Sequence, residues 1–143
     1  SSFEDSDVTE ERFKEVYTAD LVNGIGNLTA RVAAMIEKSG FEFEFETLTI
    51  DPEVVGFIDK YSFSDALEVV WKKIKKADTL INERQVWAVD GDEQKEILGE
   101  LVKTIRQIAT DTEPFMPDTA NKISEQYNKK QIKKATHLFG RIV

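Results

Sequence analysis

Apolar residues recur at spacings of three and four in three long stretches of this chain, and this periodicity limits the possible folds more than any other feature. The first stretch carries Leu21, Ile25, Leu28, Val32, Met35 and Ile36. Because an α-helix has about 3.6 residues per turn, these side chains share one face, which must pack against another element. The same spacing recurs over residues 63–81 and 97–109. It predicts an all-α, antiparallel helix bundle.

The ends of the helices are indicated by glycine, proline and small polar residues. Gly40 ends the first helical stretch, which begins near residue 8. Thr18 could cap a helix of its own, so two arrangements stay open there: one continuous helix, or a separate short helix over 9–17. Pro52 and Pro117 suit the first turn of a helix, and they predict short helices over 52–60 and 117–127.

Residues 41–46 alternate phenylalanine with glutamate. A period of two suits a β-strand, but the rest of the chain offers no sheet for that strand to join. We therefore expect an extended connector between two helices. We also expect the tail, residues 129–143, to pack back on the bundle as part of a single domain of residues 1–143.

Composition excludes several classes of protein. The net charge is −8, which argues against a nucleic-acid binder that relies on neutralising phosphates, so any RNA contact would have to be local. Cysteine is absent, which excludes disulfides and thiolate metal sites. The apolar runs are far shorter than the roughly 20 residues that cross a bilayer. We expect a cytoplasmic protein without a membrane or DNA partner.

The residues needed for most enzyme chemistry are missing. A di-iron bundle needs two Glu-x-x-His motifs, whereas His137 is the single histidine and is expected to be a surface or tail residue. Gly24-Ile-Gly26 does not complete a dinucleotide-binding loop, so these small residues are expected to let another helix approach closely. We expect no catalytic residue, no metal site and no cofactor in this chain.

Five segments resemble the anticodon-binding domain of methionyl-tRNA synthetases, a class Ia family. They occur in the family's order and span almost the whole chain: ADLVNGIGNLTARV (19–32), ALEVVW (66–71), ADTLINERQVW (77–87), EPFMPDTANKI (113–123) and LFGRI (138–142). The resemblance implies that the chain recognises the anticodon loop of methionine tRNA as the C-terminal domain of a methionine–tRNA ligase.

The resemblance also implies three binding residues. An Asn and an Arg of the first long helix face the anticodon in this family, and they match Asn27 and Arg31. Residues four apart are neighbours on one face of a helix, which suits this pair. In this family a loop tryptophan stacks on an anticodon base, and its position matches Trp87. The role is physically reasonable, because unstacked RNA bases commonly stack on aromatic rings. Trp71, within an apolar stripe, is expected to be a core residue instead.

Some positions depart from the family pattern. Val86 stands where proline is frequent, which puts the rigidity of the Trp87 loop in doubt, and Gly140 and Thr18 replace a common proline and asparagine. The family's catalytic signatures, His-Ile-Gly-His and Lys-Met-Ser-Lys-Ser, are both absent. The resemblance therefore assigns ATP binding, methionine activation and any zinc to an upstream catalytic domain, which would also be a partner.

Two alternatives remain from the sequence alone. The chain could be the anticodon-binding domain of another class Ia synthetase, since these share the bundle. It could also be a helical protein-interaction module, which the acidic composition would suit. The arrangement of Asn27, Arg31 and Trp87 tests the interaction module, because only anticodon recognition requires them on one exposed surface. The ending Leu-Phe-x-Arg-Ile and the run Ala-Asp-Leu-x-Asn-x-x-Gly-Asn-Leu point towards methionine rather than another class Ia amino acid.

Overall fold

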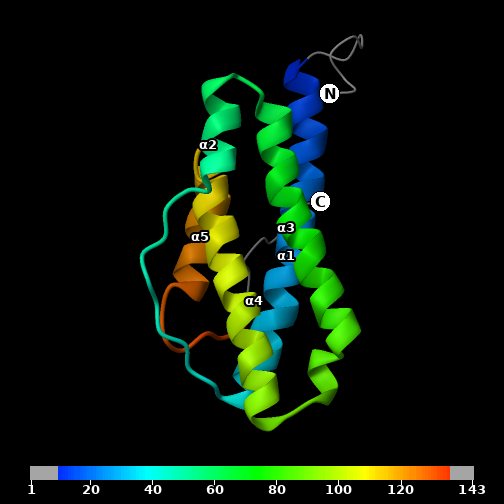
Figure 1. Cartoon of the computed structure of the whole chain (residues 1–143), viewed down its shortest axis with the longest axis vertical. Coiled ribbons are helices and arrows are strands. Elements are labelled where there is room, and N and C mark those ends of the chain that lie inside the picture. Colours follow the sequence, from blue (N-terminus) through cyan, green and yellow to red (C-terminus); the bar gives the residue numbers. More distant parts are fainter. Residues whose placement is uncertain (1–9, 136–143) are drawn as a thin grey trace.

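The computed structural model describes residues 10–135, with side chains from residue 18 onward (Figure 1). The predictions for His137 and for the tail beyond residue 135 lie outside this range. The described elements are α1 (Glu10–Ser39), α2 (Pro52–Asp59), α3 (Phe63–Arg84), the 3-10 helix η1 (Val86–Ala88), α4 (Gly91–Thr112) and α5 (Pro117–Tyr127). The predicted all-α bundle is confirmed, as are the short helices that begin at Pro52 and Pro117.

Helix α1 runs without interruption through Thr18, so the alternative of a separate short helix over 9–17 is wrong for the residues described. A threonine caps a helix only where the chain before it leaves the helical conformation. No proline or glycine precedes Thr18 in residues 10–17. Nothing there breaks the helix.

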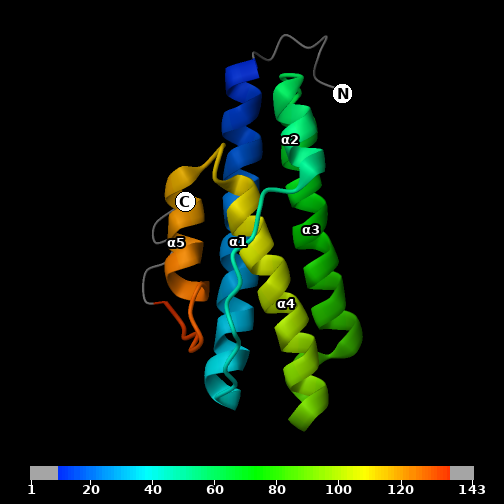
Figure 2. The ribbon, with the colours of Figure 1, turned by 60° about the vertical axis from the view of Figure 1, so that its left-hand side comes forward.

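The connector, residues 41–50, is extended, as predicted, and it sets the directions of the helices. It runs back along the outside of the bundle before α2 begins (Figures 1 and 2). As a result α1 and α3 run in the same direction, while α4 runs against both. Each step along the chain from α1 to α5 is antiparallel, so α1 and α3, which pack against each other, run parallel.

A continuous apolar core lies between α1, α3, α4 and α5. Its largest fully buried side chains are Tyr127, Leu21, Ile25, Leu28, Ile36, Leu67, Ile74, Ile81, Leu98, Leu101, Ile105 and Ile108. The Tyr127 hydroxyl donates to the carbonyl of Thr29 at 2.6 Å, which joins α5 to α1. Burial raises the pKa of this phenol far above its ordinary value, so the hydroxyl stays a donor.

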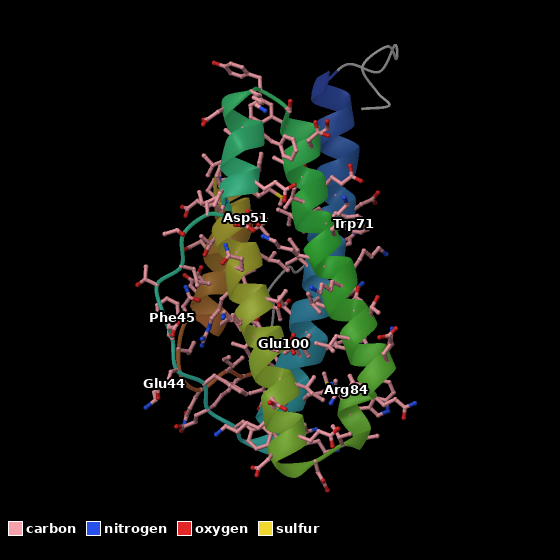
Figure 3. All side chains as sticks on the ribbon, in the orientation of Figure 1. Glu44, Phe45, Asp51, Trp71, Arg84 and Glu100 are labelled. Atoms are coloured by element: carbon pink, nitrogen blue, oxygen red, sulfur yellow. The ribbon has the colours of Figure 1, made fainter. Side chains whose placement is uncertain are left out.

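Arg106 of α4 holds the connector and the turn after α5 in place. Its buried guanidinium donates to backbone carbonyls on both: Phe43, Glu44, Tyr127 and Lys129. Burial lowers the pKa of this guanidinium, but an arginine remains charged at any physiological pH. Figure 3 shows Glu44 and Phe45 on the connector beside α4, and the Phe45 ring centre lies 5.4 Å from the guanidinium carbon.

A second polar cluster fixes the start of α2. The Lys73 ammonium of α3 lies 2.7 Å from Asp51 and also pairs with the fully buried Asp111 of α4. The Asp51 carboxylate accepts from the Glu53 N–H at 2.8 Å and thereby caps α2. The Asp51 N–H donates to Asp111 at 2.9 Å. Three helices are therefore joined at one lysine.

The Arg106 contacts predict a large effect on stability. Replacing Arg106 with methionine keeps an apolar stem but leaves four backbone carbonyls without their donor, each of which costs free energy when buried. We expect the free energy of unfolding to fall by about 3 kcal/mol in urea titrations. Lys103→Met, at an exposed position of the same helix, is the matched control. Equal stability of the two variants would contradict this account.

The Asp51–Lys73 pair predicts a pH dependence with a defined sign. Hydrogen bonds from Lys73 and Glu53 hold the pKa of Asp51 below its ordinary value. Burial acts to lower the pKa of Lys73, but its bonds to Asp111 and Asp51 raise it overall. The Asp51 contribution is therefore present above its unfolded pKa, near pH 4, and is lost as the pH falls through the lower folded value. The Lys73 contribution is present at neutral pH and is lost as the pH rises through a folded pKa above about 10.5.

Asp51→Asn tests the acid limb, because asparagine retains a good N-cap while losing the charge. We expect the stability difference between wild type and this variant to be constant from pH 6 to 8 and to shrink below about pH 4. A difference that stays unchanged down to about pH 2 would show that the carboxylate charge contributes nothing.

Candidate functional site

Trp87 lies on η1, in the short loop between α3 and α4, and 56% of its surface is exposed. The loop is anchored at the preceding residue: Val86 is fully buried, and its carbonyl accepts from the Gln94 side chain at 3.0 Å. Gln85 adopts a left-handed conformation, with φ of 48°, which turns the chain out of α3. The loop is thus fixed by the burial of Val86, without the proline that the resemblance led us to expect, and the indole remains mostly exposed.

The Trp87 indole forms one wall of a groove of about 500 Å³. The end of α1 contributes Ala34, Met35 and Lys38 to this groove, and Gln94 of α4 contributes from the other side. The lining is largely apolar, and its charged members are Lys38 and Asp90. Such a surface can accept the face of a planar ring while a cation lies nearby.

Asn27 and Arg31 are both exposed on α1. The Arg31 guanidinium is held against α3, where it donates to the Asn82 side chain at 3.3 Å and lies 3.8 Å from the Asp78 carboxylate. Partial burial raises the pKa of Asp78 above its ordinary value, and the charge of Arg31 acts against this shift. Sequence reasoning missed both partners of Arg31. The signal available was that residues 78 and 82 are four apart on one face of α3.

The three predicted residues follow one another along the junction of α1 and α3. Helical spacing places Asn27 one turn before Arg31, and Met35 of the Trp87 groove one turn after it. Arg31 contacts α3 near its end, a few residues before Trp87. The structure therefore places all three on adjoining exposed turns of one side, with Asn27 farthest from the indole.

Trp71 of α3 also lies at this junction (Figure 3). It packs against the core and is partly buried. A Cβ added at Gly24 would lie 3.0 Å from the Trp71 ring, so the predicted role of this glycine in close helix approach is confirmed. The Lys75 ammonium lies 4.9 Å from the Trp71 ring centre. Trp71 is a packing residue, as predicted, although its ring is not fully enclosed.

The described part of the chain contains no cluster of three or more histidines or acidic residues arranged to hold a metal ion. None of the helices placed by the structure is long and apolar enough to span a membrane. The fold and the exposed junction define the class of molecule: an all-α domain whose candidate site is an open surface formed by α1 and the α3–α4 loop.

No family model matches the chain. Several curated proteins do, and each is a methionine–tRNA ligase. The relative from Clostridium acetobutylicum is 34% identical and aligns with 82% of this chain. Those from Listeria monocytogenes and Thermotoga maritima are 30% and 28% identical over 92% and 94% of the chain. The chain belongs to the methionine–tRNA ligase family and spans between 21% and 24% of the length of these relatives.

The two tryptophans should differ in their effect on folding. Trp71→Ala removes a ring that packs against Gly24 and the core, and we expect it to lower the free energy of unfolding by about 2 kcal/mol, less than for a fully enclosed ring. Trp87→Ala removes a mostly exposed ring and should cost about 0.5 kcal/mol or less. Thermal and urea unfolding of both variants measure this difference. Greater destabilisation by Trp87→Ala would mean that its indole is chiefly a structural residue.

Proposed function

We propose that this chain recognises the anticodon loop of methionine tRNA as the C-terminal domain of a methionine–tRNA ligase. The observation that carries the proposal is the exposed Trp87 indole, which is held on an anchored loop. It lines one groove with Met35, which follows Arg31 by one turn of α1. A large exposed ring on a fixed loop contributes little to folding. It does provide a platform for an unpaired base, which exposes its π-face in a single-stranded loop.

Asn27 and Arg31 add hydrogen-bonding groups beside this platform. An asparagine offers a donor and an acceptor to a base edge, and an arginine can donate to a base or to a phosphate. Asp78 and Asn82 already orient the Arg31 guanidinium. Less side-chain freedom is therefore lost when RNA binds, which favours affinity.

The local charge supports this proposal despite the acidic composition. Arg31 and Lys38 lie along the proposed surface beside the carboxylates of Asp78 and Asp90. The acidic connector, which carries Glu44, lies on the other side of α4 (Figure 3). Contact with RNA can thus be local. The few basic groups predict modest affinity that falls as salt rises.

The ligation reaction itself is proposed for a part of the parent protein outside this chain. The relatives are named as ligases that join methionine to tRNA. ATP binding, methionine activation and any zinc would belong to that catalytic domain, which would be a partner of this one, in the cytoplasm. Between the alternatives, the shared name of the relatives favours methionine over the other class Ia amino acids. The adjoining positions of Asn27, Arg31 and Trp87 favour RNA recognition over a protein-interaction module.

The experiment compares binding of a methionine-type anticodon stem-loop with that of a loop whose anticodon bases are changed. We expect Trp87→Ala and Arg31→Ala each to weaken cognate binding by about 1 to 3 kcal/mol and to reduce discrimination between the two loops. Tyr61→Ala, an 80% exposed aromatic residue of the α2–α3 turn, is the control for Trp87. Arg84→Ala is the control for Arg31, since both arginines are similarly exposed and each makes one surface ion pair.

If both test variants remain folded and discriminate the two loops as the wild type does, the assigned surface is wrong. If the wild-type chain itself binds both loops equally, the chain does not read the anticodon.

A further inference from the structure

A cluster of lysines lies on the other side of α1 from the Arg31 junction. We define the tail lysine cluster as Lys122 of α5 with Lys129, Lys133 and Lys134 of the segment that follows α5. All four are exposed and line one open hollow of about 600 Å³, together with Glu125 and Gln126. This concentration of positive charge stands out in a chain whose net charge is −8.

Carboxylates lie close to the cluster: Glu42 accepts from the Gln131 side chain of the same hollow, and Glu37 accepts from the Lys134 N–H. Among the described residues, the neighbouring Lys130 pairs with Glu44 at 3.3 Å, but none of the four cluster lysines forms an ion pair with a carboxylate. Glu125, in the same hollow, is the one carboxylate among its lining residues. The ammonium groups are therefore available to an anionic ligand.

The backbone that carries these lysines is held firmly. Ile132 is buried in the core, and the Gln126 side chain donates to the Lys133 carbonyl at 2.8 Å. The Lys134 N–H donates to the Glu37 carboxylate of α1 at 2.9 Å. The cluster is thus a fixed surface of the domain, with its charged ends free to adjust.

The bond to Glu37 places this cluster next to the proposed anticodon surface. Glu37 is followed directly by Lys38, which lines the Trp87 groove. Consecutive residues of a helix point about 100° apart around its axis, so the last turns of α1 separate the two surfaces. Between them α1 carries two small side chains, the exposed Ala30 and the half-buried Ala34 of the Trp87 groove, which leave room for a ligand to pass over the helix.

We propose that the tail lysine cluster binds backbone phosphates of the same RNA whose anticodon loop contacts Trp87. The open hollow suits an extended phosphodiester chain, and lysines contact phosphates as mobile point charges without reading bases. The proposal rests on the proposed function, but it assigns a separate role to separate residues. The cluster supplies affinity, and the Trp87 surface supplies discrimination.

The test uses two variants of the full 143-residue chain with the same change in charge. The first is Lys129→Gln, Lys133→Gln, Lys134→Gln. The control is Lys60→Gln, Lys76→Gln, Lys103→Gln, at exposed positions on α2–α3, α3 and α4. Binding of an unmodified methionine tRNA is measured across a salt titration, alongside cognate and altered anticodon stem-loops, and thermal melting confirms that each variant is folded.

We expect the first variant to bind the tRNA about tenfold more weakly than the control at roughly 0.1 M salt. The slope of log K plotted against log salt should be smaller in magnitude by about two, because each phosphate contact contributes about 0.7 to 0.9 to that slope. The ratio between cognate and altered loops should be unchanged. Affinity within twofold of the control, with the same slope, would overturn the lysine assignment. If that variant still discriminated the two loops, the proposed function would remain supported. Loss of discrimination with an unchanged slope would also overturn the lysine assignment, because the lysines would then contact bases. A wild-type chain that fails to bind RNA would overturn both proposals.

Discussion

The Arg106 guanidinium lies where the connector crosses α4 and where the chain turns after α5, and it binds backbone carbonyls from both segments. In an all-α protein an extended segment has no sheet to receive its polar backbone groups, and buried carbonyls without donors are costly. Arginine suits this position because its planar group carries several donors that stay charged. The connector and the segment after α5 are in this way attached to one side chain. They are also bonded to each other, because the Phe43 N–H donates to the Lys130 carbonyl at 3.0 Å.

The path of the connector determines which surfaces of the bundle meet. Because the chain returns along the bundle before α2, α3 runs parallel to α1. Gly24 therefore lies against Trp71, and Arg31, two turns further along α1, lies against Asp78, two turns further along α3. This arrangement brings the loop after α3 to the end of α1, where Trp87 and Lys38 form one groove. It also leaves the opposite side of α1 to the segment after α5, through the bond between Lys134 and Glu37. The contacts of Arg106 therefore support the geometry on which both proposed RNA surfaces depend.

Much of the fold follows from local rules that the sequence displays directly. Apolar periodicity and the positions of Pro52 and Pro117 identified the helices, and the alternating segment was rightly predicted to be extended. The break suggested at Thr18 was wrong, because a capping residue does not end a helix that nothing interrupts. The parallel pairing of α1 with α3 was not predicted, since it depends on a long-range path that periodicity does not encode. For the same reason Asp78 and Asn82 were not recognised as partners of Arg31. Trp71 was correctly predicted to be packed because it lies within a helical apolar stripe, and Trp87 to be exposed because it lies in a loop.

Trp87 is proposed to contact the RNA, whereas Trp71 serves packing, and these are the two tryptophans of the chain. An NMR titration can follow both, because each indole N–H gives one resolved signal in a ¹⁵N-labelled chain. On addition of a methionine-type anticodon stem-loop, the account predicts a large, saturable shift or broadening of the Trp87 signal and little change at Trp71, with a smaller effect from a loop of altered anticodon. A titration in which the Trp87 signal does not move, while signals elsewhere saturate, would contradict it.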